Sequence, residues 1–265
     1  MGKDSEFYKD KKRKQTLRLR ELLSGLPQCA RDYIQSKEVT AQPSTLVQYS
    51  YDLLIFFQFL KDNNPLVRNT PIKDIRVDIL DRIDPKDIVE YQRYLELNVD
   101  KLHYHESGKR AIARRMAPLR GMYKYLVRNK DIKNNPTELV DLPRIKKDKN
   151  IVRMNATEVR DILTTISTES ASMTKRQKQF AEKTRYRDLA ILTLMLNTGI
   201  RVSECNGLDL SDVDLKANTL VIVRKGGGQD VLYFGDAVHD ALQDYLDTER
   251  KLITPREGHE KAFFL

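Results

Sequence analysis

The chain has 265 residues, of which 40% are hydrophobic and 32% charged, a balance typical of folded globular proteins and not of disordered or fibrous ones. Its two cysteines, Cys29 and Cys205, lie far apart without a Cys-x-x-Cys spacing, so the sequence predicts neither a disulfide framework nor a zinc module. The net charge of +9 is uneven: residues 1–150 contain 31 Lys and Arg against 21 Asp and Glu, whereas residues 151–265 contain 16 against 17.

A basic half indicates a polyanionic partner, either nucleic acid or an acidic membrane surface. The sequence has no apolar run of about 18 residues and no amino-terminal signal with a short apolar core, which disfavours a membrane partner. We therefore expect a soluble, cytoplasmic protein that binds nucleic acid. His103 and His105 lack carboxylate or thiol partners, so we expect a solvated loop there and predict no metal and no cofactor.

The amino-terminal half has the pattern of an all-helical domain. Residues 1–27 are rich in Lys and Arg and are predicted to form a basic arm, with a solvated helix as the alternative. Residues 28–129 are predicted to form a helical DNA-binding domain. Its helices begin at Pro43 and end near Asn63, run from Pro85 to Leu97 behind an Asp84 N-cap, and run from about Ser107 to Val127.

The helix at 107–127 combines an apolar stripe with basic residues on its other faces. Residues 101–150 contain 14 basic and 5 acidic side chains, which predicts phosphate binding, although a charge run can also be a solvated face. Residues 130–150 are predicted to be an interdomain linker that lies along DNA. The predicted DNA-binding residues are Lys109, Arg110, Arg114, Arg115, Lys124, Arg128, Lys146 and Lys147.

Residues 151–265 are predicted to form a mixed α and β domain. Asn155 and Glu158 make a capping pair, and the segment Leu189–Leu196 is apolar on nearly every face, which predicts a helix at the centre of the domain that ends at Gly199. A short helical turn, a β-hairpin with a glycine-rich tip and an amphipathic helix follow, at residues 201–207, 219–223 with 231–234, and 238–246.

Two basic residues of this domain suit phosphate chemistry. Arg201 follows the glycine stop of the apolar helix and could give bidentate hydrogen bonds to phosphate oxygens, and Lys225 lies at the hairpin tip. Each has a plain alternative: Arg201 could simply pair with Glu204 on its own turn, and the glycines could be no more than hairpin residues. The glycine stretch lacks the Walker pattern.

Longer motifs resemble the tyrosine recombinase (phage integrase) family, of the Xer or mobile-element integrase type. Residues 187–192, 198–204, 207–208 and 212–214 resemble its first catalytic box, and Lys225, 24 positions after Arg201, matches the hairpin lysine of the family. Residues 114–126 resemble the last helix of its core-binding domain. The resemblance implies a mainly α protein, with a SAM-like four-helix core-binding domain and a mixed α+β catalytic domain, partial here, with a small antiparallel sheet.

The resemblance also implies roles. Arg201 matches the first active-site arginine, Glu204 the acidic residue that orients it, and Lys225 the general acid, with no metal required. Two positions depart from the family: Pro118, where we expect the helix to kink or restart, and Asp230, where relatives often carry a basic residue.

A third departure concerns activity. The family continues with a His-x-x-Arg box and a nucleophilic tyrosine, which this sequence lacks, and Tyr186, Tyr233 and Tyr245 lie upstream of the place for that nucleophile. We therefore expect a recombinase or integrase that forms a 3′-phosphotyrosine intermediate and a tetramer on double-stranded DNA, but a chain that is truncated and only binds DNA. The alternatives are a naturally truncated regulator of recombination sites and a helical transcription factor.

Overall fold

The computed structural model describes residues 6–97, 108–145, 153–168, 173–224 and 227–265. The chain divides into two compact units: residues 12–149, and residues 150–265 together with residues 1–11. Each unit has its own hydrophobic core. In the part of the chain that the structure describes, no helix is both long and apolar enough to cross a membrane.

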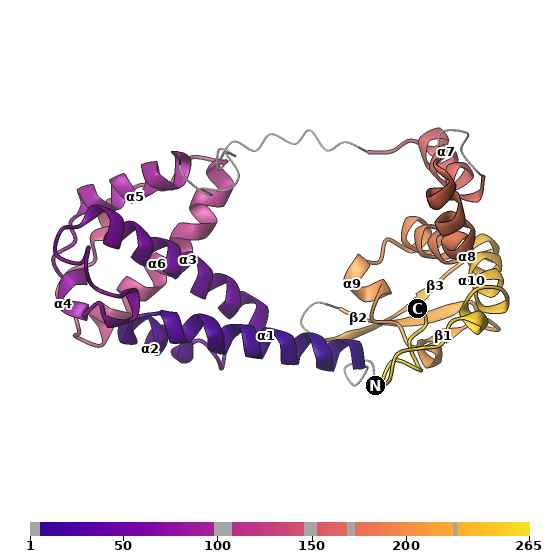
Figure 1. The fold of residues 1–265 in the computed structure, drawn as a ribbon, viewed down its shortest axis with the longest axis horizontal. Helices are drawn as coiled ribbons and strands as arrows, with labels where there is room; N and C mark the ends of the chain where they lie inside the picture. Colours follow the sequence, from indigo (N-terminus) through magenta and orange to yellow (C-terminus); the bar gives the residue numbers. More distant parts are fainter. Residues whose placement is uncertain (1–5, 98–107, 146–152, 169–172, 225–226) are drawn as a thin grey trace. The chain divides into compact units, whose positions relative to one another are not determined.

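The first unit is helical. Aromatic side chains fill its core, where the ring of Phe56 meets those of Tyr91 and Tyr123 edge to face at centroid distances of 5.1 and 6.5 Å. Its elements are α1 (Glu6–Gly25, whose first residues are grouped with the second unit), α2 (Gln28–Ser36), α3 (Pro43–Asn63), η1 (Ile72–Asp74), α4 (Val77–Leu80), α5 (Pro85–Leu97), α6 (Lys109–Arg128) and η2 (Pro136–Leu139) (Figure 1).

The helices predicted at 43–63 and 85–97 are confirmed. Pro43 occupies the first turn of α3, where its missing N–H costs nothing. The Asp84 carboxylate accepts the backbone N–H groups of Lys86 and Asp87 at 2.7 and 3.1 Å and so caps α5. Local caps and an apolar face were therefore sufficient to locate both helices.

Two segments predicted to be peripheral belong to the packed structure instead. Residues 6–25 form helix α1, and Leu19, Leu22 and Leu26 are buried, so the described part of this region is not an arm. The described part of the predicted linker is also packed, because Ile132 and Val140 are buried against the helices. The helical unit therefore extends beyond residue 129.

Helix α6 continues through Pro118, so of the kink or restart expected there from the sequence, the restart does not occur. A proline removes one N–H and crowds the preceding turn, but Pro118 is buried among the packed helices, which hold α6 together there. Three residues further on, Gly121 allows a close approach of α2: a Cβ built on it would lie 2.2 Å from the Tyr33 hydroxyl oxygen.

The second unit combines helices with a three-stranded antiparallel sheet of order β1-β2-β3. The predicted hairpin is confirmed, with Val221 opposite Val231. Leu220 and Ile222 on one face of β2 are buried. The elements are α7 (Ala156–Ser167), α8 (Lys175–Thr198), α9 (Val202–Cys205), η3 (Leu210–Asp212), β1 (Val213–Asp214), β2 (Thr219–Val223), β3 (Gln229–Tyr233), α10 (Asp236–Asp247) and η4 (Arg250–Leu252) (Figure 1).

Helix α8 is longer and less buried than the sequence predicted. It begins at Lys175, well before the apolar segment Leu189–Leu196 on which the prediction rested, and only Ala190, Thr193 and Leu194 of its residues are buried. Its middle is held by the buried Glu249 carboxylate, which accepts the backbone N–H groups of Tyr186 and Arg187 at 2.8 and 2.9 Å. Glu249 is 62 positions from Arg187, so the local sequence pattern could not predict this contact.

Candidate phosphate-binding site and nucleic-acid interface

Arg201 is presented by a rigid turn. Helix α8 ends at Gly199 in the left-handed conformation (φ 67°), and Arg201 then takes the N-cap position of the short helix α9. The Arg201 backbone N–H donates to Glu204 Oε2 at 2.8 Å, and its Nη1 donates to Glu204 Oε1 at 2.7 Å. The Arg201 side chain is still 63% exposed, so it can also meet a ligand from solvent.

Glu204 is the buried centre of this arrangement, with a side chain only 3% exposed. Burial by itself raises the pKa of Glu204, but the backbone N–H and guanidinium of Arg201, with the added charge of Arg224, outweigh it and leave the pKa below its ordinary value. Glu204 is therefore a carboxylate at neutral pH and holds Arg201 by both charge and hydrogen bonds.

Sequence reasoning missed Arg224. This residue directly follows β2, and its Nη1 donates to Glu204 Oε2 at 3.2 Å while its Nε donates to Asp230 Oδ2 at 2.7 Å. The signal available was its place immediately before Lys225 and six residues before Asp230. The structure therefore joins the α9 turn to the hairpin through one carboxylate.

Helix α6 supplies the predicted basic surface. Arg110, Arg114, Lys124 and Arg128 are exposed, and at 3.6 residues per turn their positions fall within roughly 80° around the helix axis, so they share one face. Arg128 also lies over the Tyr125 ring, 5.9 Å from its centroid. Lys109, at the start of the helix, is exposed on a neighbouring face.

Two neighbouring arginines of α6 are tied to the interior of the helical unit. Arg114 Nη1 lies 2.9 Å from Asp52 Oδ2, and Arg115 Nε lies 3.9 Å from Asp52 Oδ1. Burial raises the pKa of Asp52 despite the two arginines, so this carboxylate is costly to charge without them. The Arg115 side chain is only 14% exposed, which favours a structural role for it over the predicted contact with DNA.

Some predicted residues lie outside those that the structure describes: His103, His105, Lys146, Lys147 and Lys225.

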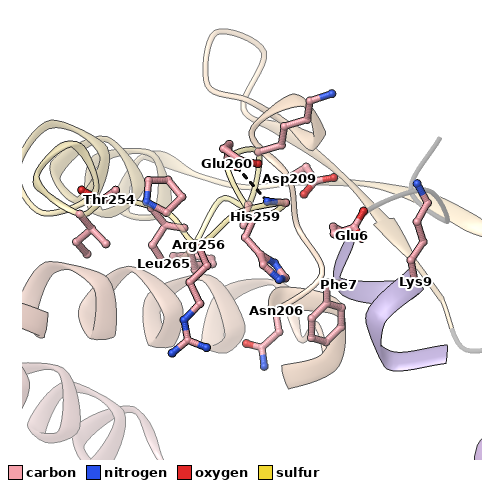
Figure 2. Close-up of a pocket in the computed structure, with 16 residues that line it drawn as sticks. Glu6, Phe7, Lys9, Asn206, Asp209, Thr254, Arg256, His259, Glu260 and Leu265 are labelled. Carbon is pink, nitrogen blue, oxygen red and sulfur yellow. Dashed lines mark hydrogen bonds between the residues drawn. The ribbon is translucent and has the colours of Figure 1, made fainter. Parts of the chain in front are cut away.

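A cavity of about 690 Å³ lies in the second unit, and neither Arg201 nor Glu204 lines it. Figure 2 shows Glu6, Phe7 and Lys9 of α1 on one side of it, and Thr254, Arg256 and Leu265 on the other. Its walls combine acidic, basic and apolar side chains, without a cluster of like charge to select a ligand.

Next to this cavity, Tyr8 of α1 contacts helix α9, which follows Arg201; the segment from Gly199 to Cys205 is called the arginine turn below. Its hydroxyl donates to the Ser203 carbonyl at 3.3 Å, and a Cβ built on Gly207 would lie 2.6 Å from its ring. Burial, reinforced by Glu204 and Asp212, raises the pKa of Tyr8, so its hydroxyl stays protonated and able to donate at neutral pH.

Comparison with known proteins connects these features. Residues 152–263 match the family model described as "Phage integrase family". The chain is 31% identical over 232 residues to tyrosine recombinase XerC of Caldanaerobacter subterraneus subsp. tengcongensis, covering 84% of this chain and 58% of that protein. It is 28% identical over 270 residues to tyrosine recombinase XerS of Streptococcus uberis, covering 94% of this chain and 74% of that protein.

Solved structures show the same fold. The XerH recombinase bound to a palindromic difH substrate in a post-cleavage complex matches with a TM-score of 0.59 at 17% identity, over 85% of this chain and 57% of that one. The Tn1549 transposon integrase in complex with transposon right end DNA matches with a TM-score of 0.59 at 17% identity, over 90% and 70%.

The chain thus spans a little over half the length of the XerC relative, and the matched segment holds the arginine turn and the hairpin. The motif around Arg201, the mainly helical fold with its small antiparallel sheet, and the agreement of relatives and structures lead to one conclusion. The chain belongs to the tyrosine recombinase family.

Proposed function

We propose that the protein is a site-specific recombinase or integrase that cleaves and rejoins double-stranded DNA through a 3′-phosphotyrosine intermediate. The observation that carries the proposal is the exposed Arg201 guanidinium, fixed by buried Glu204 on a turn within the segment that matches the family. A cation fixed in advance stabilises the extra negative charge of a pentacoordinate phosphorane without reorganisation. Lys225 would protonate the departing 5′ oxygen, and the covalent intermediate would conserve the phosphodiester energy, so no ATP is needed.

For the 265-residue chain by itself, we propose DNA binding without cleavage. Its sequence contains no His-x-x-Arg motif. Tyr245 is buried in the second core, where its hydroxyl accepts the Leu265 backbone N–H, so it is poorly placed to attack a phosphate. Recombination by a chain that carries this motif and a nucleophilic tyrosine would use four protomers on two duplexes. Labelled DNA incubated with this chain should yield no covalent adduct.

We assign DNA binding to helix α6, and charge reversal on this helix tests the assignment. The double variant Arg110→Glu/Lys124→Glu should bind duplex DNA at least tenfold more weakly than the wild type, because phosphate contacts from both residues would be lost. Fluorescence anisotropy over a range of salt concentrations measures the affinity, which should fall steeply as salt rises in the wild type.

The matched control is Lys175→Glu/Arg176→Glu, which changes the net charge by the same amount on exposed residues of α8. It should reduce affinity much less, because these residues lie off the proposed surface. Equal losses in the two double variants would refute α6 as the DNA surface, and a salt-insensitive wild-type affinity would refute the proposed partner. Arg114 is avoided, because its replacement would also remove the partner of buried Asp52.

A further inference from the structure

Arg224 occupies a fixed position at the base of the hairpin tip. Its backbone N–H donates to the Gly228 carbonyl at 2.8 Å, and its carbonyl accepts the Gly227 N–H at 2.8 Å. Gly227 has a φ of 91°, which a side chain would disfavour, so the glycine is needed for this closure. The Arg224 side chain therefore starts from an anchored point of the backbone.

From that point the side chain reaches the arginine turn. One buried carboxylate, Glu204, binds guanidinium groups from two different elements: Arg201 at 2.7 Å and Arg224 at 3.2 Å. Arg201 remains 63% exposed and Arg224 33% exposed, so both can meet a solvent-borne anion. A guanidinium has five N–H donors, and among the described residues no contact uses Nη2 of Arg224.

The two acidic partners of Arg224 differ in how firmly they are held. Glu204 is buried and also binds the Arg201 backbone, whereas Asp230 is 54% exposed. An exposed ion pair contributes little free energy, so a phosphate can replace it at small cost. Together Arg201, Arg224, Glu204 and Asp230 have no formal net charge, and displacing Asp230 from Arg224 would leave the site cationic toward its ligand.

We propose that Arg224 is a second phosphate-binding arginine beside Arg201, which exchanges the Asp230 carboxylate for a phosphate of DNA while Glu204 holds it in place. This assignment rests on the proposed function, because its ligand is the same duplex DNA. Asp230 then acts as an internal competitor that weakens DNA binding at the hairpin. Loss of this competitor should strengthen binding only if Arg224 is present.

The salt dependence of DNA affinity tests the proposal in the 265-residue chain. Arg224→Ala should weaken binding about tenfold at low salt and flatten the slope of log affinity against log salt by about 0.9, the contribution of one phosphate contact. Asp230→Asn should strengthen binding severalfold, and Arg224→Ala/Asp230→Asn should show none of that gain. Lys216→Ala, which removes an exposed charge from the turn between β1 and β2, is the control and should leave the slope nearly unchanged.

An unchanged slope in Arg224→Ala, or a gain from Asp230→Asn that persists without Arg224, overturns the role of Arg224 and leaves the proposed function intact. A wild-type chain without salt-dependent binding refutes the proposed function and this role together. Thermal unfolding of each variant checks the fold. If Arg224→Ala fails to fold, Arg224→Gln replaces it, since glutamine can still donate to Glu204 but has no charge.

Discussion

At the Arg201 turn, the stability of the loop and the orientation of the ligand-binding group depend on the same carboxylate. Glu204 accepts the Arg201 backbone N–H and guanidinium and the Arg224 guanidinium, and it is buried. A buried donor that loses its acceptor costs about 1–3 kcal/mol. The charge of Glu204 should therefore contribute to the free energy of unfolding in a way that depends on pH.

We predict that Glu204→Gln lowers the free energy of unfolding by roughly 1–3 kcal/mol at pH 7. The pKa of Glu204 is lowered on folding, so its stabilisation is complete above the ordinary value of 4.5 and disappears as the pH falls through the lower folded-state pKa. Urea unfolding of the wild type and of Glu204→Gln from pH 7 to pH 3 should show that their difference in free energy of unfolding becomes smaller as the pH falls. A difference that stays constant with pH would contradict the role of the charge; exposed Glu257→Gln is the control.

Between elements, the contact of α2 with α6 depends on the absence of a side chain at residue 121. Gly121→Ala would gain roughly 1 kcal/mol of helix propensity, but its Cβ would lie 2.2 Å from the hydroxyl oxygen of buried Tyr33. Overpacking of this kind costs about 1–3 kcal/mol, so we predict a net loss of stability, measured by thermal or urea unfolding.

The matched rescue is Tyr33→Phe/Gly121→Ala, which removes the hydroxyl oxygen and leaves the nearest ring carbon at 3.0 Å. The double variant should recover at least half of the loss seen in Gly121→Ala, measured against Tyr33→Phe alone. If Gly121→Ala is as stable as the wild type, α2 and α6 can move apart without cost. If the double variant recovers no stability, the Tyr33 hydroxyl is not the cause of the loss.

Several elements with local signals were predicted from the sequence, whereas packing set by distant contacts was not. The caps at Asp84 and Asn155 and the left-handed Gly199 act within a few residues, so their helices were located well. The start of α8 was missed although it has a local signal, the capping box of Thr174 and Gln177. The packing of residues 130–145 was missed because it depends on burial against other helices. Tertiary contacts there override local polarity.

The site divides in the same way. The Arg201 and Glu204 pair is three residues apart and could be predicted from one turn of chain. Arg224 reaches Glu204 from 20 residues further along the chain, directly after β2. Its place beside Lys225 marks it in the sequence but does not show which carboxylate it meets. Arg115 resembled the other cations of α6 in the sequence. Arg114 and Arg115 both pair with Asp52 of α3, but only the Arg115 side chain is largely buried, at 14% exposed against 47% for Arg114.

Across the whole molecule, the chain has two cores and one buried cysteine in each. Cys29 belongs to the helical core and Cys205 to the core of the second unit. Burial raises the pKa of Cys29 to about 11 and that of Cys205 to about 12, so both thiols should be unreactive in the native protein at pH 8. Each thiol can therefore report the opening of its own unit.

We predict that a thiol reagent labels neither cysteine in buffer, and that rising urea exposes them at separate midpoints if the two cores unfold independently. Mass spectrometry of the labelled peptides, with Cys29→Ala and Cys205→Ala as single-site controls, identifies each transition. Added duplex DNA should delay the labelling of Cys29, because a ligand held by α6 stabilises the helical unit. Identical midpoints, shifted together by DNA, would show instead that the two cores unfold as one cooperative body.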